Sequence, residues 1–138
     1  MTIYLDENLP PALANGFDTL QAPLSTGSGK NCIRVKSIAE EFGAGVADED
    51  WIPKLDSGKD IVITQDYNIN RIKEQRLLCE KHGLGMIYFR PPSKNGFTYY
   101  DMLRMLVKHW PEIVRKAQKE KRPFSFKITS RSASLDEI

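Results

Sequence analysis

Cysteine is scarce in this chain of 138 residues, and long hydrophobic runs are missing from it. The two cysteines, Cys32 and Cys79, are too few for a disulfide framework and lack the C-x-x-C spacing of a metal site. No apolar run approaches the roughly 18 residues that a membrane-spanning helix needs. Met1 leads directly into an apolar stretch, without the basic leader of an export signal. We therefore expect a cytoplasmic protein with no membrane partner.

The formal charge of +2 conceals an uneven distribution along the chain. Residues 104–131 hold nine Lys or Arg and two Glu, a net charge of +7, so the rest of the chain carries −5. An acidic body with a basic C-terminal segment could bind a polyanion on one side and cations on the other. Taken alone, the basic segment is explained more simply as a solvated helix face.

Strand-like and helix-like patterns alternate, which predicts an α/β domain with a mainly parallel sheet. Apolar or alternating runs predict strands at residues 2–5, 32–36, 60–64, 84–89 and 124–129. Helical patterns begin near residues 11, 48, 68 and 98, and the last is a basic segment to about residue 122 with a kink or break at Pro111. At 41% hydrophobic content, we expect one domain over residues 1–138, with a polar tail at 130–138 that frays.

Three carboxylates occupy positions where an open parallel sheet places its functional crevice. Asp6 follows the first predicted strand, Asp66 follows the third, and Asp48 opens the helix between them. Three acids brought together repel one another unless a cation neutralises them, and oxygen ligands suit Mg²⁺ or Mn²⁺. Such an ion lowers the pKa of a bound water and stabilises charge on a phosphoryl group. The pattern therefore favours phosphodiester hydrolysis.

The residues around these acids resemble the motifs of the PIN-domain superfamily, and most closely its short prokaryotic PIN-like branch related to VapC-type toxins. The motifs are LDENLP at residues 5–10, ADEDWI at residues 47–52 and ITQDYNI at residues 63–69. They occur in the order that the family shows, and the resemblance covers roughly residues 2–90.

This resemblance implies a three-layer PIN-like fold, in which helices flank a mainly parallel central sheet, and a metal-dependent endoribonuclease activity. It also implies that the protein is the toxin of a toxin–antitoxin pair, with RNA as its substrate and a cognate antitoxin as its partner. The implied catalytic residues, which hold Mg²⁺ or Mn²⁺, are Asp6, Asp48 and Asp66, and the auxiliary ligands are Asn8, Glu49 and Asn68.

The sequence departs from the family pattern in two respects. Typical relatives carry a further Glu on a helix after the first strand, whereas the nearest candidates here, Glu40 and Glu41, follow the second predicted strand. Asn68 stands where many relatives have Asp, and Ile69 stands where they have Phe. The site therefore has less formal negative charge than its relatives.

Basic side chains near the acidic edge and on the C-terminal helix are candidates for contacts with RNA phosphates. They are Arg71, Arg76 and Arg90 near the edge, and Lys116, Lys119 and Lys121 on the helix. The same helix carries an apolar stripe over residues 100–117, which would allow a homodimer if the stripe extends beyond its own core.

Other roles for the acids remain open at this point. They could be ordinary helix caps. A receiver-like domain could use Asp6, Glu7 and Asp66 to bind Mg²⁺ and accept phosphate, but this leaves Asp48 unexplained and the sequence shows no strand-ending Lys partner. A degenerate PIN-like domain could bind RNA or protein without cleaving it. As a surface carboxylate in a repulsive cluster, Asp6 is expected to contribute little to folding.

Overall fold

The computed structural model describes residues 1–138, which form one mixed sheet with helices on both faces. The strands are β1 (Thr2–Leu5), β2 (Arg34–Ser37), β3 (Ile61–Gln65), β4 (Gly85–Arg90), β5 (Phe124–Thr129) and β6 (Asp136–Glu137). The α-helices are α1 (Pro11–Gln21), α2 (Ile38–Phe42), α3 (Asp48–Trp51), α4 (Ile69–Lys81) and α5 (Tyr99–Lys119). Three short 3₁₀ helices cover Ala22–Leu24, Gly29–Asn31 and Ile52–Lys54.

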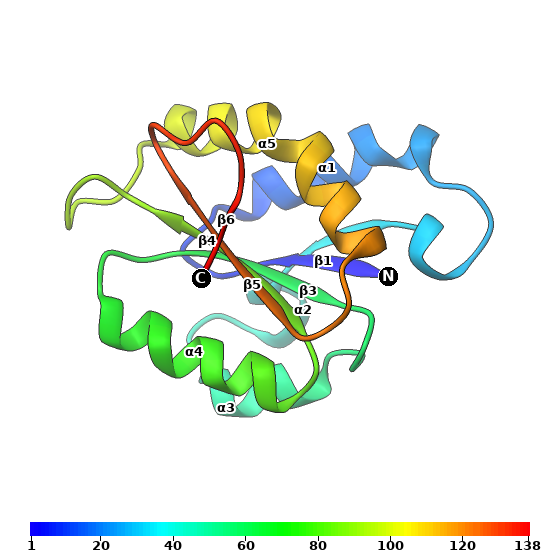
Figure 1. Cartoon of the computed structure of the whole chain (residues 1–138), viewed down its shortest axis with the longest axis horizontal. Coiled ribbons are helices and arrows are strands. Elements are labelled where there is room, and N and C mark those ends of the chain that lie inside the picture. Colours follow the sequence, from blue (N-terminus) through cyan, green and yellow to red (C-terminus); the bar gives the residue numbers. More distant parts are fainter.

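The sheet has the strand order β2-β1-β3-β4-β5-β6, and all neighbours are parallel except β5 and β6. Helices α1 and α5 lie on one face, and α3 and α4 lie on the other (Figure 1). The predicted three-layer α/β architecture is therefore confirmed. None of the helices is both long and apolar enough to traverse a lipid bilayer.

The core consists of two layers, one on each face of the sheet, because side chains alternate along each strand. Ile3 and Leu5 of β1 pack with α1 and α5, whereas Tyr4 between them packs with the layer of α3 and α4. The same alternation separates Ile61 and Ile63 from Val62 in β3. Burial on both faces explains why these strands are continuous apolar runs in the sequence.

Glycine at the start of β4 is required by close packing between neighbouring strands. A Cβ atom at Gly85 would lie 2.4 Å from Cζ of Phe124 and 2.7 Å from Cγ2 of Ile61. Any larger residue would force the Phe124 and Ile61 side chains to move, so glycine at position 85 leaves room for these two side chains.

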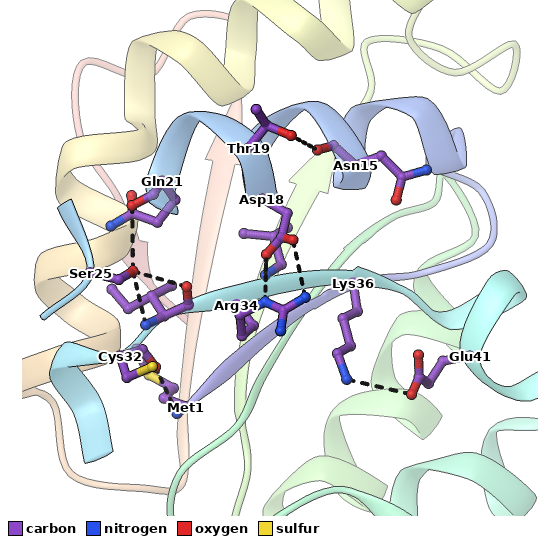
Figure 2. Close-up of polar contacts among 12 residues, drawn as sticks. Met1, Asn15, Asp18, Thr19, Gln21, Ser25, Cys32, Arg34, Lys36 and Glu41 are labelled. Atoms are coloured by element: carbon purple, nitrogen blue, oxygen red, sulfur yellow. Dashed lines mark hydrogen bonds and ion pairs between the residues drawn. The ribbon is translucent and has the colours of Figure 1, made fainter. Parts of the chain in front are cut away.

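Side chains close the outer edge of β2, as Figure 2 shows. Asp18 of α1 forms a two-pronged ion pair with Arg34, and its carboxylate also accepts a hydrogen bond of 2.8 Å from the backbone N–H of Val35. The Ser25 hydroxyl accepts from the N–H of Ile33 and donates to its carbonyl oxygen. This edge therefore offers few free backbone groups to another strand.

The structure differs from the sequence prediction in the C-terminal region. The tail at 130–138, which was expected to fray, folds back so that β6 pairs with β5 and Leu135 is buried. Pro111 lies inside one unbroken helix, which changes direction between its yellow and orange halves (Figure 1). A bend without a break is the expected result of losing one helical hydrogen bond at a proline.

Candidate active site

Two of the three acids lie at the same edge of the sheet because β1 and β3 are adjacent and parallel. Asp6 directly follows β1 and Asp66 directly follows β3. The Asp6 N–H donates a hydrogen bond of 2.9 Å to the carbonyl oxygen of Ile63, which extends the strand pairing to the end of β1. The carboxyl edge of the sheet thus carries acidic side chains, as the topology requires.

Asp6 is only 2% exposed, so its carboxylate is an internal group and not a surface one. One oxygen, Oδ2, accepts hydrogen bonds from the Thr64 hydroxyl at 2.9 Å and from Nε2 of Gln75 at 3.0 Å. The other, Oδ1, accepts from the N–H of Glu7 at 2.7 Å. Three donors fix the orientation of this carboxylate and replace the water that burial removes.

Asp48 begins α3 and lies near Asp6. Glu7 positions the loop that leads to it, because Oε2 of Glu7 accepts a hydrogen bond of 2.8 Å from the N–H of Gly45. Partial burial raises the pKa of Asp48, and the negative charge of Asp6 raises it further, while the nearby Arg71 guanidinium acts in the opposite direction. Neither Asp48 nor Asp6 forms an ion pair.

Asp66 lies at the end of β3, and its carboxylate forms an ion pair with the Arg71 side chain. Its Oδ2 lies 3.3 Å from Nη1 of Arg71, and its Oδ1 accepts a hydrogen bond from the N–H of Asn68. The Tyr88 hydroxyl donates a 2.6 Å hydrogen bond to the Asp66 carbonyl oxygen. Asp66 is therefore held in place from the first turn of α4 and from β4.

The auxiliary residues are distributed around this edge in different ways. The Asn8 side chain donates to the Gln65 carbonyl oxygen, and its own Oδ1 is buried without a hydrogen-bond partner. The Asn68 Oδ1 caps α4 by accepting from two backbone N–H groups, so it is already engaged. Glu49 is exposed in the first turn of α3. Glu40 and Glu41 lie in the first turn of α2, where acids suit the helix dipole.

The donor set matches a hard divalent cation only in part. Asp6 and Asp48 are two mutually repelling carboxylates, neither of which forms an ion pair. The buried Oδ1 of Asn8 has no hydrogen-bond partner, and Asn8 lines a cleft with Asp66 and Arg71. Oxygen donors of this kind suit Mg²⁺ or Mn²⁺. However, no group of three or more His, Cys, Asp or Glu side chains is close enough to hold an ion. The carboxylate of Asp66 is already paired with Arg71.

The predicted RNA-binding residues fall into two groups. On α4 and β4, Arg71 pairs with Asp66, and Arg76 and Arg90 line a cavity beside the acidic edge. On α5, the Lys116 ammonium lies 3.4 Å from Glu120 and 4.6 Å from the centre of the Phe126 ring. Lys119 and Lys121 are exposed.

The sequence analysis did not identify Gln75, whose side chain donates a hydrogen bond to the Asp6 carboxylate. Gln75 is 1% exposed, on the inward face of α4 with Ile72 and Cys79. A polar residue in an otherwise apolar stripe was the available signal, but the partner, Asp6, lies 69 residues away in sequence. Cys79 packs in the same layer, where burial, and secondarily the charges of Asp48 and Asp6, raise its thiol pKa to about 12. It is therefore an inert core residue.

The raised pKa of Asp48 predicts how its substitution affects stability. A carboxyl whose pKa is higher in the folded protein than in the unfolded chain destabilises folding as it ionises, so this loss appears as pH rises above the ordinary pKa of 3.8. At about pH 7, Asp48→Asn should therefore unfold at a higher urea concentration than Asp50→Asn. Asp50 lies in the same first turn of α3 but is exposed. Both variants lose the favourable interaction of a carboxylate with the helix dipole, so the comparison isolates the effect of burial and of the Asp6 charge on Asp48.

The measurement is urea unfolding of both variants at about pH 7 and about pH 3. The advantage of Asp48→Asn should vanish at the lower pH, because Asp48 is then neutral in the unsubstituted protein too. An advantage of the same size at both pH values would show that no charge repulsion acts on Asp48.

The fold and this edge together define a class of protein: a mainly parallel α/β domain with acidic side chains at the carboxyl ends of adjacent strands. The chain belongs to the PIN-like domain family, which its sequence matches over residues 1–91. This matched region runs from β1 through β4 and contains all three acids. No curated protein and no solved structure matches the chain significantly.

Proposed function

We propose that this PIN-like protein is an endoribonuclease that hydrolyses RNA phosphodiester bonds with the aid of Mg²⁺ or Mn²⁺. The observation that carries the proposal is the approach of Asp6 and Asp48, two carboxylates without an ion pair, at the carboxyl edge of the sheet. Proteins rarely bring two such groups together unless they bind a cation or a proton.

In this proposal the chain's own residues prepare the site. Asp6, Asp48 and Asp66 would hold the ion, with Asn8, Glu49 and Asn68 as auxiliary oxygen donors. When bound, the ion activates a water and stabilises negative charge on the phosphoryl group. Thr64 and Gln75 hold the Asp6 carboxylate in one orientation, and Arg71 offers a positive charge beside Asp66 to an incoming phosphate.

The same proposal assigns a biological role and a partner. The resemblance to VapC-type toxins supports the role of toxin in a toxin–antitoxin pair. The cognate antitoxin would be a protein that covers the acidic edge and so blocks access of RNA. The exposed Lys119 and Lys121, at the opposite end of the chain from the acids, supply a second cationic surface for RNA.

The test is calorimetric titration of Mn²⁺ into the wild-type protein and into Asp66→Asn, with cleavage of single-stranded RNA followed in the same samples. We expect measurable binding and cleavage in the wild type and a loss of both in the variant, because an amide is a weaker ligand than a carboxylate. Wild-type protein that binds no Mn²⁺ and cleaves no RNA at any metal concentration would contradict the proposal.

A second function is favoured by the ion pair between Arg71 and Asp66. This pair neutralises one of the three acids with a cation of the protein itself, which suits a domain that binds RNA or protein without cleaving it. The same experiment separates the two functions. RNA binding in the presence of Mn²⁺ without any cleavage would identify the chain as a binding module.

A further inference from the structure

A cavity of about 310 Å³ lies between α4, β4, β5 and the end of the chain. It is distinct from the acidic edge, since none of the three acids lines it. Its volume falls at the lower end of the 300–1,000 Å³ that is typical of small-ligand sites. None of the functional roles assigned to the acids accounts for it.

All the charged side chains that line this cavity are cationic. They are Lys73, Arg76, Arg90 and Lys127, and no lining side chain is acidic. The buried Nε atom of Arg76 makes no hydrogen bond but forms an ion pair with Glu80 at 3.6 Å, so Lys73, Arg90 and Lys127 are the cations without an ion-pair partner. A concave surface with this charge attracts an anion, and phosphate matches the guanidinium geometry.

The remaining walls of the cavity are mostly apolar. They include Ile69, Ile72 and Leu77 of α4 and Tyr88 of β4. Ile69 and Leu77 are 43% and 61% exposed, unusually high fractions for large apolar side chains on a helix that packs on a sheet. A free inorganic anion would make no favourable contacts with these apolar walls. A flat heterocycle attached to a phosphate contacts both the apolar walls and the cationic side chains.

The cavity adjoins the acidic edge through two elements that contribute to both. The Tyr88 side chain lines the cavity, and its hydroxyl donates to the backbone of Asp66. Helix α4 carries Arg71 at the acidic edge and Arg76 in the cavity. A single RNA strand that passes the acids can therefore place a neighbouring nucleotide over α4.

We infer that this cavity is a nucleotide subsite, in which one unpaired nucleotide of single-stranded RNA lays its base against Ile69, Leu77 and Tyr88 while Arg76, Arg90 and Lys127 contact its phosphates. The inference rests on the proposed function in its choice of RNA as the ligand. The few polar groups of the apolar walls make the subsite tolerant of base identity.

The test measures binding of a fluorescent six-nucleotide RNA by anisotropy, in EDTA so that cleavage plays no part. The comparison ligand is the same ribose-phosphate chain without bases. The wild type should bind the base-bearing RNA at least about fivefold more tightly, as expected for one base resting on side chains. Leu77→Gln should abolish this preference, whereas Leu20→Gln, an equally exposed leucine on α1, should preserve it.

The phosphate contacts are tested by the double variant Arg90→Gln/Lys127→Gln. It should bind both ligands more weakly, and the magnitude of the slope of log affinity against log salt should fall by about 1.4, or about 0.7 for each of the two phosphate contacts removed. The control Lys81→Gln, on the last turn of α4 outside the cavity, should leave affinity and slope nearly unchanged.

Several results would overturn the inference. They are equal binding of the two ligands by the wild type, a base preference that survives in Leu77→Gln, and binding of an acidic leucine-containing peptide without RNA binding. Peptide binding without RNA binding would make the cavity a protein-docking site.

Because binding is measured without metal, the experiment separates this inference from the proposed function. A protein that shows the base preference but never cleaves RNA would refute the nuclease proposal and leave the nucleotide subsite intact. A protein that cleaves RNA in the presence of metal but shows no base preference would support the nuclease proposal and refute the nucleotide subsite.

Discussion

Asp48→Asn should reduce metal-dependent RNA cleavage at least about 100-fold in a protein that remains fully folded. The substitution removes one of the two carboxylates that approach each other without an ion pair, and with it several kcal/mol of stabilisation at the reacting phosphate. Each 1.36 kcal/mol corresponds to a factor of ten in rate. The measurement is the single-turnover rate on a fixed RNA with saturating Mn²⁺.

The matched control is Asp50→Asn, which changes the same chemical group two residues away. Asp50 is exposed and does not contribute to the pKa shift of Asp48. Its cleavage rate should stay within about twofold of the wild type. Equal RNA cleavage rates in Asp48→Asn and Asp50→Asn would show that Asp48 is not part of the catalytic site, even if the protein proved to be a nuclease.

Trp51→Ala should lower the free energy of unfolding by about 3–5 kcal/mol, the usual cost of removing a large buried aromatic side chain. Trp51 is 1% exposed and is one of the largest fully buried side chains in the protein. It packs in the layer between α3, α4 and the sheet, with Ile52 and Ile72. Because it ends the helix that Asp48 begins, the cavity left behind should also loosen the acidic edge.

Chemical denaturation with urea measures the effect, and Tyr100→Ala provides an aromatic control. Tyr100 is 68% exposed on α5, so its removal should cost less than about 0.5 kcal/mol. A loss below about 1 kcal/mol for Trp51→Ala would mean that α3 is not part of the cooperative fold. Asp48 would then lack the fixed position that the proposed site requires.

The burial of Asp6 changes what its substitution can report. Sequence reasoning treated it as a surface carboxylate with little effect on folding, but the structure encloses it with donors from Thr64 and Gln75. An amide at this position presents N–H atoms to at least one existing donor, and an unmet buried polar group costs about 1–3 kcal/mol. Loss of activity in an Asp6 variant therefore has two possible causes, which is why Asp48 is the better probe.

The sequence was sufficient to predict the sheet and the placement of two acids on it. A run such as residues 61–64 is apolar and β-branched, and strand-ending acids must lie at the carboxyl edge once the strands are parallel. The first strand and the last long strand, β1 and β5, have the predicted bounds.

The details of the site could not be predicted because they depend on contacts between distant segments. Gln75 meets Asp6, and Glu7 meets Gly45, across 69 and 38 residues. The pairing of Arg71 with Asp66 depends on the geometry of the first turn of α4. The positions of charged residues in the sequence do not reveal this geometry. The return of the tail as β6 likewise depends on a free edge of β5 and a place for Leu135.

The closed edge of β2 limits how copies of this protein can assemble. Asp18 and Ser25 occupy backbone groups along that edge, and at the other end of the sheet β6 contains only two residues. Neither border offers the long row of free N–H and C=O groups on which a sheet grows from one molecule to the next. A second copy, or an inhibitory partner, must therefore approach through helices and side chains, and the protein is protected against association through its strands when its concentration rises.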